Sequence, residues 1–185
     1  MLDSCMCEPV HETGGKLSEE TVAWMKTQLE EAKKQGVTVI PVSHHNLLDE
    51  STLYPEECTI ENTKEVTALL EAYGVPVYLS GHLHLQRIKK HTSNLNTPGG
   101  YGIREIVTSP LPMAPCQYSI LNWQADGSLS YHTKKVDIAG WAQRYGEEDE
   151  NLLNFDAYAD QFLVDVISEQ AFKALQSASK DIKEE

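Results

Sequence analysis

The sequence predicts a mixed α/β protein. Two hydrophobic runs rich in β-branched residues, at 37–42 and 75–80, are separated by a segment with helical periodicity. After the second run the pattern changes to several short strands with no helix between them, and the end of the chain has a long helical pattern. This order is typical of folds that combine a parallel βαβ unit with antiparallel strands.

Two helices are predicted in the first half of the chain. Residues 17–35 are amphipathic, with Ser18 as a candidate N-cap and Gly36 suited to the position after the last turn. The second helix begins near Asn62, which together with Glu65 resembles a capping box. This helix lies between the two hydrophobic runs, so we expect those strands to be buried, parallel neighbours joined by a right-handed crossover.

Four more strands are predicted after the second hydrophobic run. The dipeptide Asp126-Gly127 is a strong hairpin signal between the last two. Since no helix intervenes, we expect the four to form a second, mostly antiparallel sheet; they span residues 86–90, 103–108, 118–124 and 128–136. The predicted domains are therefore residues 1–136 and an acidic helical extension at 137–185.

Composition and charge exclude several classes of partner. The net charge of −13 argues against a nucleic-acid polymer or an anionic membrane, because both require clustered Lys and Arg. No run approaches the ~20 apolar residues of a membrane span. The first residues lack the basic and apolar regions of a signal peptide, so we expect a cytoplasmic protein if this start is genuine. Export of a longer form stays an alternative, and the compartment is left open.

Histidines follow both hydrophobic strands at the point where each strand ends. The stretch Ser43-His44-His45-Asn46 comes after the first strand, and Gly81-His82-Leu83-His84 comes after the second. Ligands collect at the carboxyl ends of the strands in open α/β sheets, and neutral imidazole is the commonest protein ligand for transition metals. The sequence therefore predicts a metal site at this edge of the sheet.

The same two stretches resemble the last two motifs of the calcineurin-like metallophosphoesterases. That family has five motifs, D-x-H, G-D-x-x-D, G-N-H-[DE], a lone His and G-H-x-H, and the first three do not occur in this sequence. The resemblance extends over roughly residues 1–135. It implies the C-terminal half of the family's four-layer αββα sandwich, in which the later strands form the second sheet.

The resemblance also implies roles for the histidines. His44 matches the lone His, and it and His82 would bind one metal, while His84 would bind the other. His45 is a candidate for substrate binding, with a hydrogen bond to a ligand or a plain strand-end position as alternatives. The intact enzyme would hold two divalent or trivalent transition metals (Mn, Fe or Zn) and hydrolyse small phosphomonoesters or phosphodiesters. Some bacterial members that it resembles act on cyclic nucleotides.

Three hypotheses for the function follow. The first is a fragment of such a phosphoesterase, and since the carboxylate ligands are missing we expect this chain alone to be inactive. The second is a noncatalytic, truncated or degenerate relative that acts as a binding partner, for which exposed sheet edges would favour association. The third is a mononuclear zinc hydrolase built on the three matched histidines.

Overall fold

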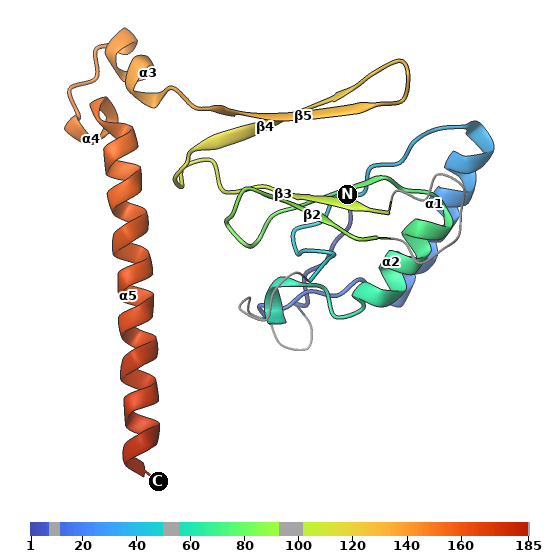
Figure 1. Ribbon diagram of the computed structural model, residues 1–185, viewed down its shortest axis with the longest axis horizontal. Coiled ribbons are helices and arrows are strands. Elements are labelled where there is room, and N and C mark those ends of the chain that lie inside the picture. Colours follow the sequence, from blue (N-terminus) through green and yellow to red (C-terminus); the bar gives the residue numbers. More distant parts are fainter. Residues whose placement is uncertain (8–11, 50–55, 93–101, 185) are drawn as a thin grey trace. The chain divides into compact units, whose positions relative to one another are not determined.

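The computed structural model describes residues 1–7, 12–49, 56–92 and 102–184. It contains two compact units, Met1–Ser109 (unit 1) and Pro110–Glu185 (unit 2). Unit 1 contains two α-helices and a three-stranded sheet, and unit 2 contains a β-hairpin and three helices (Figure 1). The predicted mixed α/β class with a helical C-terminal end is therefore confirmed. The predicted domain boundary after residue 136 stays a prediction.

Helix α1 spans Glu19–Gln35 and confirms the first predicted helix. The hydroxyl of Ser18 accepts a hydrogen bond from the backbone N–H of Thr21 at 3.1 Å, as an N-cap does. Gly36 follows the last turn with φ +66°, a left-handed conformation that glycine adopts without steric cost. The helix buries Met25 and Leu29, which belong to its apolar face.

Helix α2 spans Thr63–Ala72 and follows a short 3-10 helix at Glu56–Cys58. The predicted capping box is wrong, because the side chain of Asn62 caps no backbone group of α2. Its Oδ1 accepts from the backbone N–H of Leu17 at 3.1 Å, and its Nδ2 donates to the carbonyl of the same residue at 3.0 Å. Asn62 therefore fastens the segment before α1 to the start of α2.

The sheet of unit 1 has the order β1-β3-β2. Strand β1 (Val77–Ser80) is parallel to β3 (Arg104–Val107), and β2 (Arg87–Lys90) is antiparallel to β3. Residues 41–43 extend the sheet on the other side of β1. There the N–H of Leu79 donates to the carbonyl of Pro41 at 3.0 Å, and the N–H of Ser43 donates to the carbonyl of Leu79 at 3.1 Å. The two hydrophobic runs are parallel neighbours, as predicted.

Two predictions about strands are wrong in detail. The strands at 86–90 and 103–108 were expected in a second sheet, but β2 and β3 share one sheet with β1. The run at 37–42 was expected to be a buried strand, yet it forms an isolated bridge at Val42, and Val37 is 57% exposed. In both cases the local pattern indicates extended chain but does not specify which strand it pairs with.

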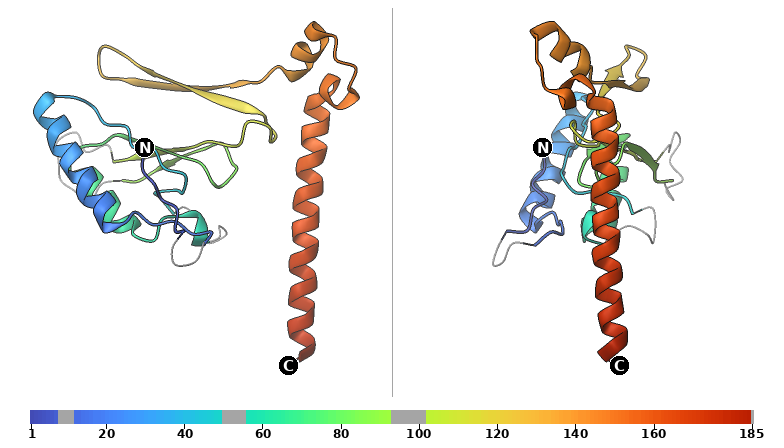
Figure 2. Two further views of the ribbon diagram at one scale, coloured as in Figure 1. Left: turned by 180° about the vertical axis from the view of Figure 1, so that it is seen from behind. Right: turned by 90° about the vertical axis from the view of Figure 1, so that its left-hand side faces the viewer.

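The hydrophobic core of unit 1 lies between the helices and the sheet. Helices α1 and α2 run side by side in both sets of views (Figures 1 and 2). Tyr78 of β1 belongs to the same buried cluster as their apolar residues and is completely inaccessible. The other members of this cluster are Leu2, Leu17, Met25, Leu29, Leu47, Leu48, Ile60, Val66, Leu70, Val75 and Ile103.

Unit 2 begins with the predicted β-hairpin. Strands β4 (Gln117–Trp123) and β5 (Leu129–Lys135) are antiparallel over their whole length. Gly127 has φ +81° in the connecting turn, which explains the glycine there. The hairpin prediction from Asp126-Gly127 is confirmed.

Three helices complete unit 2. They are α3 (Ile138–Tyr145), α4 (Glu150–Leu153) and α5 (Phe155–Glu184). Asp137 caps α3 by accepting a hydrogen bond from the N–H of Gly140 at 2.9 Å, and Asp149 caps α4 in the same way. Figure 2 shows α5 as one continuous helix. Within the described ranges, no helix combines the length and apolar character needed to cross a membrane.

Candidate functional site

The two histidine stretches lie at one edge of the unit 1 sheet. His44 follows residues 41–43, His82 follows β1, and these neighbouring segments run parallel, so their carboxyl ends meet. The N–H of Gly81 donates to the carbonyl of His44 at 3.0 Å and ties the two loops together. The predicted meeting of these side chains at the sheet edge is what the fold produces.

Three imidazole rings form a compact cluster at this edge. His44 Nε2 and His82 Nδ1 are 3.0 Å apart and share a hydrogen bond. The ring centroid of His45 lies 5.1 Å from that of His44 and 4.6 Å from that of His82. Two nitrogens bound to one tetrahedral zinc ion stand about 3.3 Å apart when each lies about 2.0–2.1 Å from the metal. The pair formed by His44 and His82 is therefore close to ligand spacing.

The surroundings favour the neutral form of the two paired histidines. Burial lowers the pKa of His44, and the positive charge that His45 and His84 can carry lowers it further. Burial also lowers the pKa of His82, together with its three histidine neighbours, while the carboxylate of Glu57 acts in the opposite direction. A neutral imidazole is the form that binds a metal ion.

The backbone of the Gly81-His82-Leu83-His84 stretch is strained. His82 has φ +62° and His84 has φ +55°, and only one other non-glycine residue in the described parts of the chain, Cys116, has a positive φ. Such conformations cost of order 1–3 kcal/mol each and are concentrated at functional sites. His84 is exposed and lies close enough to the pair to contribute to the lowered pKa of both His44 and His82.

His45, the predicted substrate-binding residue, is 3% exposed and has both ring nitrogens engaged. Nε2 lies 3.0 Å from the carbonyl of Thr13, which can only accept, so this nitrogen carries the hydrogen. Nδ1 therefore accepts from the hydroxyl of Ser4 at 2.8 Å, and that oxygen in turn accepts from the backbone N–H of His45 at 3.2 Å. A Cβ at Gly15 would collide with the His45 ring, so the chain needs glycine there.

His45 thus joins three segments of unit 1 and offers no free nitrogen to a ligand. Its predicted contact with substrate stays a prediction. In the structure its nitrogens hold the first residues of the chain and the loop at Thr13 against the strand end.

A network of buried polar side chains adjoins the loops that carry His44 and His82. The sequence patterns did not predict it. Asn46, Ser80, Lys89 and Glu105 are all inaccessible or nearly so. The carboxylate of Glu105 is 3.8 Å from the ammonium of Lys89. The signal available in the sequence was a single acidic residue inside the apolar strand pattern at 103–108, in which a charge on a buried face requires a partner.

An open pocket lies beside His44. It has a volume of about 530 Å³, which is in the range of small-molecule sites. Its lining comes from the first residues of the chain and from the end of the 41–43 segment: Met1, Leu2, Asp3, Ser4, Cys5, Val42, Ser43 and His44.

The ligand set for a metal is incomplete in the described ranges. Among residues 1–7, 12–49, 56–92 and 102–184, no group of three or more His, Cys, Asp and Glu side chains is arranged to hold a metal ion. A catalytic zinc site uses three protein ligands, and a dinuclear site also needs carboxylates to offset its charge. The histidine pair fits part of such a site and not the whole of it.

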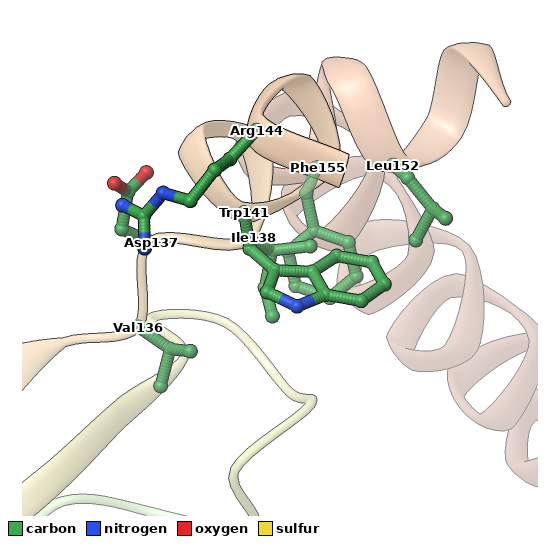
Figure 3. A pocket seen from close by; sticks show the side chains of 7 residues that line it. All are labelled: Val136, Asp137, Ile138, Trp141, Arg144, Leu152 and Phe155. Carbon is green, nitrogen blue, oxygen red and sulfur yellow. The ribbon is translucent and has the colours of Figure 1, made fainter. Parts of the chain in front are cut away.

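Unit 2 has a pocket of a different kind. It is an open, mainly apolar hollow of about 570 Å³ where α3, α4 and α5 meet. Figure 3 shows Trp141 and Phe155 among the side chains that line it, with the guanidinium of Arg144 pointing toward Asp137. The remaining lining residues are Val136, Ile138 and Leu152. Apolar side chains therefore make up most of this lining.

Comparison with known proteins bears on unit 2 alone. A family model described as the C-terminal domain of cyclic nucleotide phosphodiesterase matches residues 137–185. The match covers the segment from the N-cap of α3 to the end of the chain, which is less than half of the sequence and contains none of the four candidate histidines. A search of curated proteins finds no match. The C-terminal segment is thus similar to a domain of phosphodiesterases, which points to a phosphodiesterase-related function.

Proposed function

We propose that this chain supplies the histidine ligands of a metal-dependent phosphodiesterase of the calcineurin-like metallophosphoesterase family. The observation that carries the proposal is the pair formed by His44 Nε2 and His82 Nδ1, 3.0 Å apart where strand β1 and the parallel segment at 41–43 end. The match of residues 137–185 to a phosphodiesterase C-terminal domain supports the same class of reaction independently, because it concerns a different part of the chain.

The residues have separate roles in this proposal. His44 and His82 hold one transition metal (Mn, Fe or Zn) and His84 holds the second. His45 fixes the geometry of the strand end through its bonds to Ser4 and Thr13. When bound, the metal ions act as Lewis acids toward a phosphoryl oxygen of the ester. The substrate is a small phosphodiester, with cyclic nucleotides as the first class to test.

The remaining ligands come from outside the part of the chain that the structure describes. The histidine pair alone cannot neutralise a dinuclear centre, and the sequence contains none of the D-x-H, G-D-x-x-D and G-N-H motifs that would supply the other ligands. Taken alone, this chain is expected to bind metal weakly and to turn over little or no substrate.

Metal binding tests the proposal directly. Zn²⁺ or Mn²⁺ is titrated into the metal-free chain, and bound metal is measured by equilibrium dialysis for the unsubstituted protein, His44→Ala, His82→Ala and the control His132→Ala, which removes an exposed histidine of β5. The first two substitutions should abolish the tightest binding, and the control should keep it. Equal affinities in all four proteins would show that the pair is not a metal site.

A noncatalytic role is the second candidate, and the incomplete ligand set is the observation that favours it. The two are separated by supplying a polypeptide that carries the three absent motifs, fused ahead of residue 1 or mixed in. Metal-dependent hydrolysis of a cyclic nucleotide that is lost in His44→Ala supports the enzyme, and no hydrolysis supports the binding partner. The third hypothesis is a three-histidine zinc site. The described ranges contain no group of three ligands that would support it.

A further inference from the structure

Asn46 connects the two loops that carry the paired histidines. It stands two residues after His44, and its side-chain amide reaches the loop that follows β1. There its Nδ2 donates to the hydroxyl of Ser80 and to the carbonyl of Gly81, each at 2.9 Å. Gly81 immediately precedes His82, so one side chain spans from the His44 loop to the backbone that carries His82.

Every hydrogen-bonding group of Asn46 has a partner. The side-chain Oδ1 accepts from the ammonium of Lys89 at 3.3 Å. The backbone N–H donates to the carbonyl of Cys58, and the backbone carbonyl accepts from the N–H of Ile60, each at 2.9 Å. The residue is completely inaccessible to solvent. The carbonyl of Gly81 can only accept, so the amide must present its NH₂ group to it, which fixes the orientation of the side chain.

Glu105 holds the residues that directly follow Asn46. Its carboxylate accepts from the backbone N–H groups of Leu47 at 2.6 Å and Leu48 at 2.7 Å, and from the hydroxyl of Ser80 at 2.6 Å. Lys89, which is paired with Glu105 on the neighbouring strand β2, donates to the carbonyl of Leu48 at 2.5 Å. The residues after Asn46 are therefore hydrogen-bonded to β3 and β2, and Asn46 itself is hydrogen-bonded to the end of β1.

We propose that Asn46 is a positioning residue that sets the distance between His44 and His82, with Glu105 as the anchor of its loop. The importance of this distance for catalysis rests on the proposed function. The distance itself is a property of the metal-free protein and can be measured without any metal. The opposing view is that the network only stabilises the fold, in which case any buried hydrogen bond of similar strength would matter equally.

The test detects the hydrogen bond between the rings of His44 and His82, which forms only when the two nitrogens are close together. In metal-free protein with ¹⁵N-labelled histidine, an N–H···N hydrogen bond gives a scalar coupling between the nitrogens of His44 and His82. Asn46→Asp keeps the size of the side chain and removes the NH₂ donors, so the coupling should disappear. Tyr78→Phe is the matched control, because it removes one buried hydrogen bond, from Tyr78 to Ser43, without touching the Gly81 loop. The control should keep the coupling.

Ser80→Ala gives a milder version of the same test in case Asn46→Asp does not fold. It removes one of the two bonds between Asn46 and the β1 loop and should weaken the coupling. An unchanged coupling in Asn46→Asp or in Ser80→Ala would overturn the proposal. An equal loss of the coupling in Tyr78→Phe would also overturn the proposal. The absence of the coupling from the unsubstituted protein would do the same.

A metal titration of the same proteins separates this proposal from the proposed function. If the histidines bind Zn²⁺, Asn46→Asp should weaken that binding by about 10-fold or more, as is usual when the support of a ligand is lost, and Tyr78→Phe should leave it nearly unchanged. If no protein binds Zn²⁺ but the coupling follows the predicted pattern, the proposed function fails and the positioning role of Asn46 stands.

Discussion

One ion pair of unit 1 is buried, whereas an ion pair of unit 2 lies in solvent. Lys89 and Glu105 lie 3.8 Å apart with side chains 1% and 0% exposed, whereas Lys135 and Asp156 lie 2.7 Å apart with side chains 51% and 60% exposed. Breaking the shorter pair is expected to cost little, because water screens it and its side chains lose entropy when they meet, whereas breaking the buried pair leaves a buried charge without its partner. Distance alone therefore does not rank these interactions, and burial does.

The apolar side chains show the same contrast. In unit 1, Val66 and Leu70 of α2 are completely inaccessible. In α5 of unit 2, Phe162 is 46% exposed, Phe172 is 61% exposed and Leu175 is 70% exposed. The buried residues of unit 2 include the small Ala142 and Ala159. Unit 1 is thus organised around a closed core that also fixes the histidines, while much of α5 presents its apolar residues to solvent.

The largest difference between the units should come from removing one partner of each ion pair. Glu105→Ala deletes the acceptor of two backbone N–H groups and one hydroxyl and leaves the Lys89 ammonium without its carboxylate. We expect a loss of about 3–5 kcal/mol in the free energy of unfolding measured with urea. Asp156→Ala should cost no more than about 1 kcal/mol. Similar losses in the two variants would contradict the role assigned to burial.

Truncating one leucine in each unit tests the difference in burial of their apolar side chains. Leu70→Ala leaves a cavity in the core of unit 1 and should destabilise the protein by about 2–5 kcal/mol in the same urea measurement. Leu175→Ala removes a side chain that is 70% exposed and should change stability by no more than about 0.5 kcal/mol. A large effect at Leu175 would show that α5 is covered in solution.

Alkaline pH should weaken unit 1 through Tyr78. Burial raises the pKa of this phenol to about 12 from its ordinary 10.0. The folded state keeps a proton that the unfolded state loses, so the stabilisation is complete below pH 10 and is lost as the pH rises toward 12. The loss should reach about 2 kcal/mol at pH 12 relative to pH 9.

The matched variants isolate this contribution from other groups that titrate in the same range. Tyr78→Phe should lack it, so the difference in unfolding free energy between the parent and this variant should shrink as the pH rises. Tyr145→Phe removes a phenol that is 66% exposed and should follow the parent. A constant difference between parent and Tyr78→Phe from pH 9 to 12 would contradict the raised pKa.

The smallest predicted loss of stability comes from removing a helix cap, and each unit has a capped helix. Ser18→Ala removes the cap of α1 and should cost about 1 kcal/mol in the unfolding of unit 1, since α1 contributes Met25 and Leu29 to the core. Asp137→Ala removes the corresponding cap of α3. Hydrogen exchange should show its effect as faster exchange within α3, and an unchanged α3 would argue that packing rather than the cap holds this helix.

Local signals in the sequence were sufficient for several elements. The capped helix at 17–35 and the hairpin turn at Asp126-Gly127 were predicted because their signals act over a few residues: a side chain that bonds its neighbour's N–H, and a glycine with a positive φ. The meeting of His44 and His82 was predictable too. It follows from two parallel, hydrogen-bonded segments that end at one edge, residues 41–43 and β1, and the His-rich stretches mark those ends.

Strand partners and buried polar groups required the tertiary structure. Asn62 has the sequence context of a cap, yet it bonds to Leu17, which is distant in the chain. Neither the placement of β2 beside β3 nor the burial of Lys89 and Glu105 follows from local pattern, because each depends on which segments meet. The same holds for His45, whose nitrogens are taken by Ser4 and Thr13.

Local sequence patterns were enough to predict where helices and turns form and that histidines end two adjacent extended segments. The fold was needed to see that both ring nitrogens of His45 are engaged and that Asn46 connects the loops of His44 and His82. The two kinds of feature differ in how far along the chain their interactions reach. Caps, turns and periodicity act within a few residues, whereas the cost of burying a charge or an amide is offset only by partners that folding brings from elsewhere in the chain.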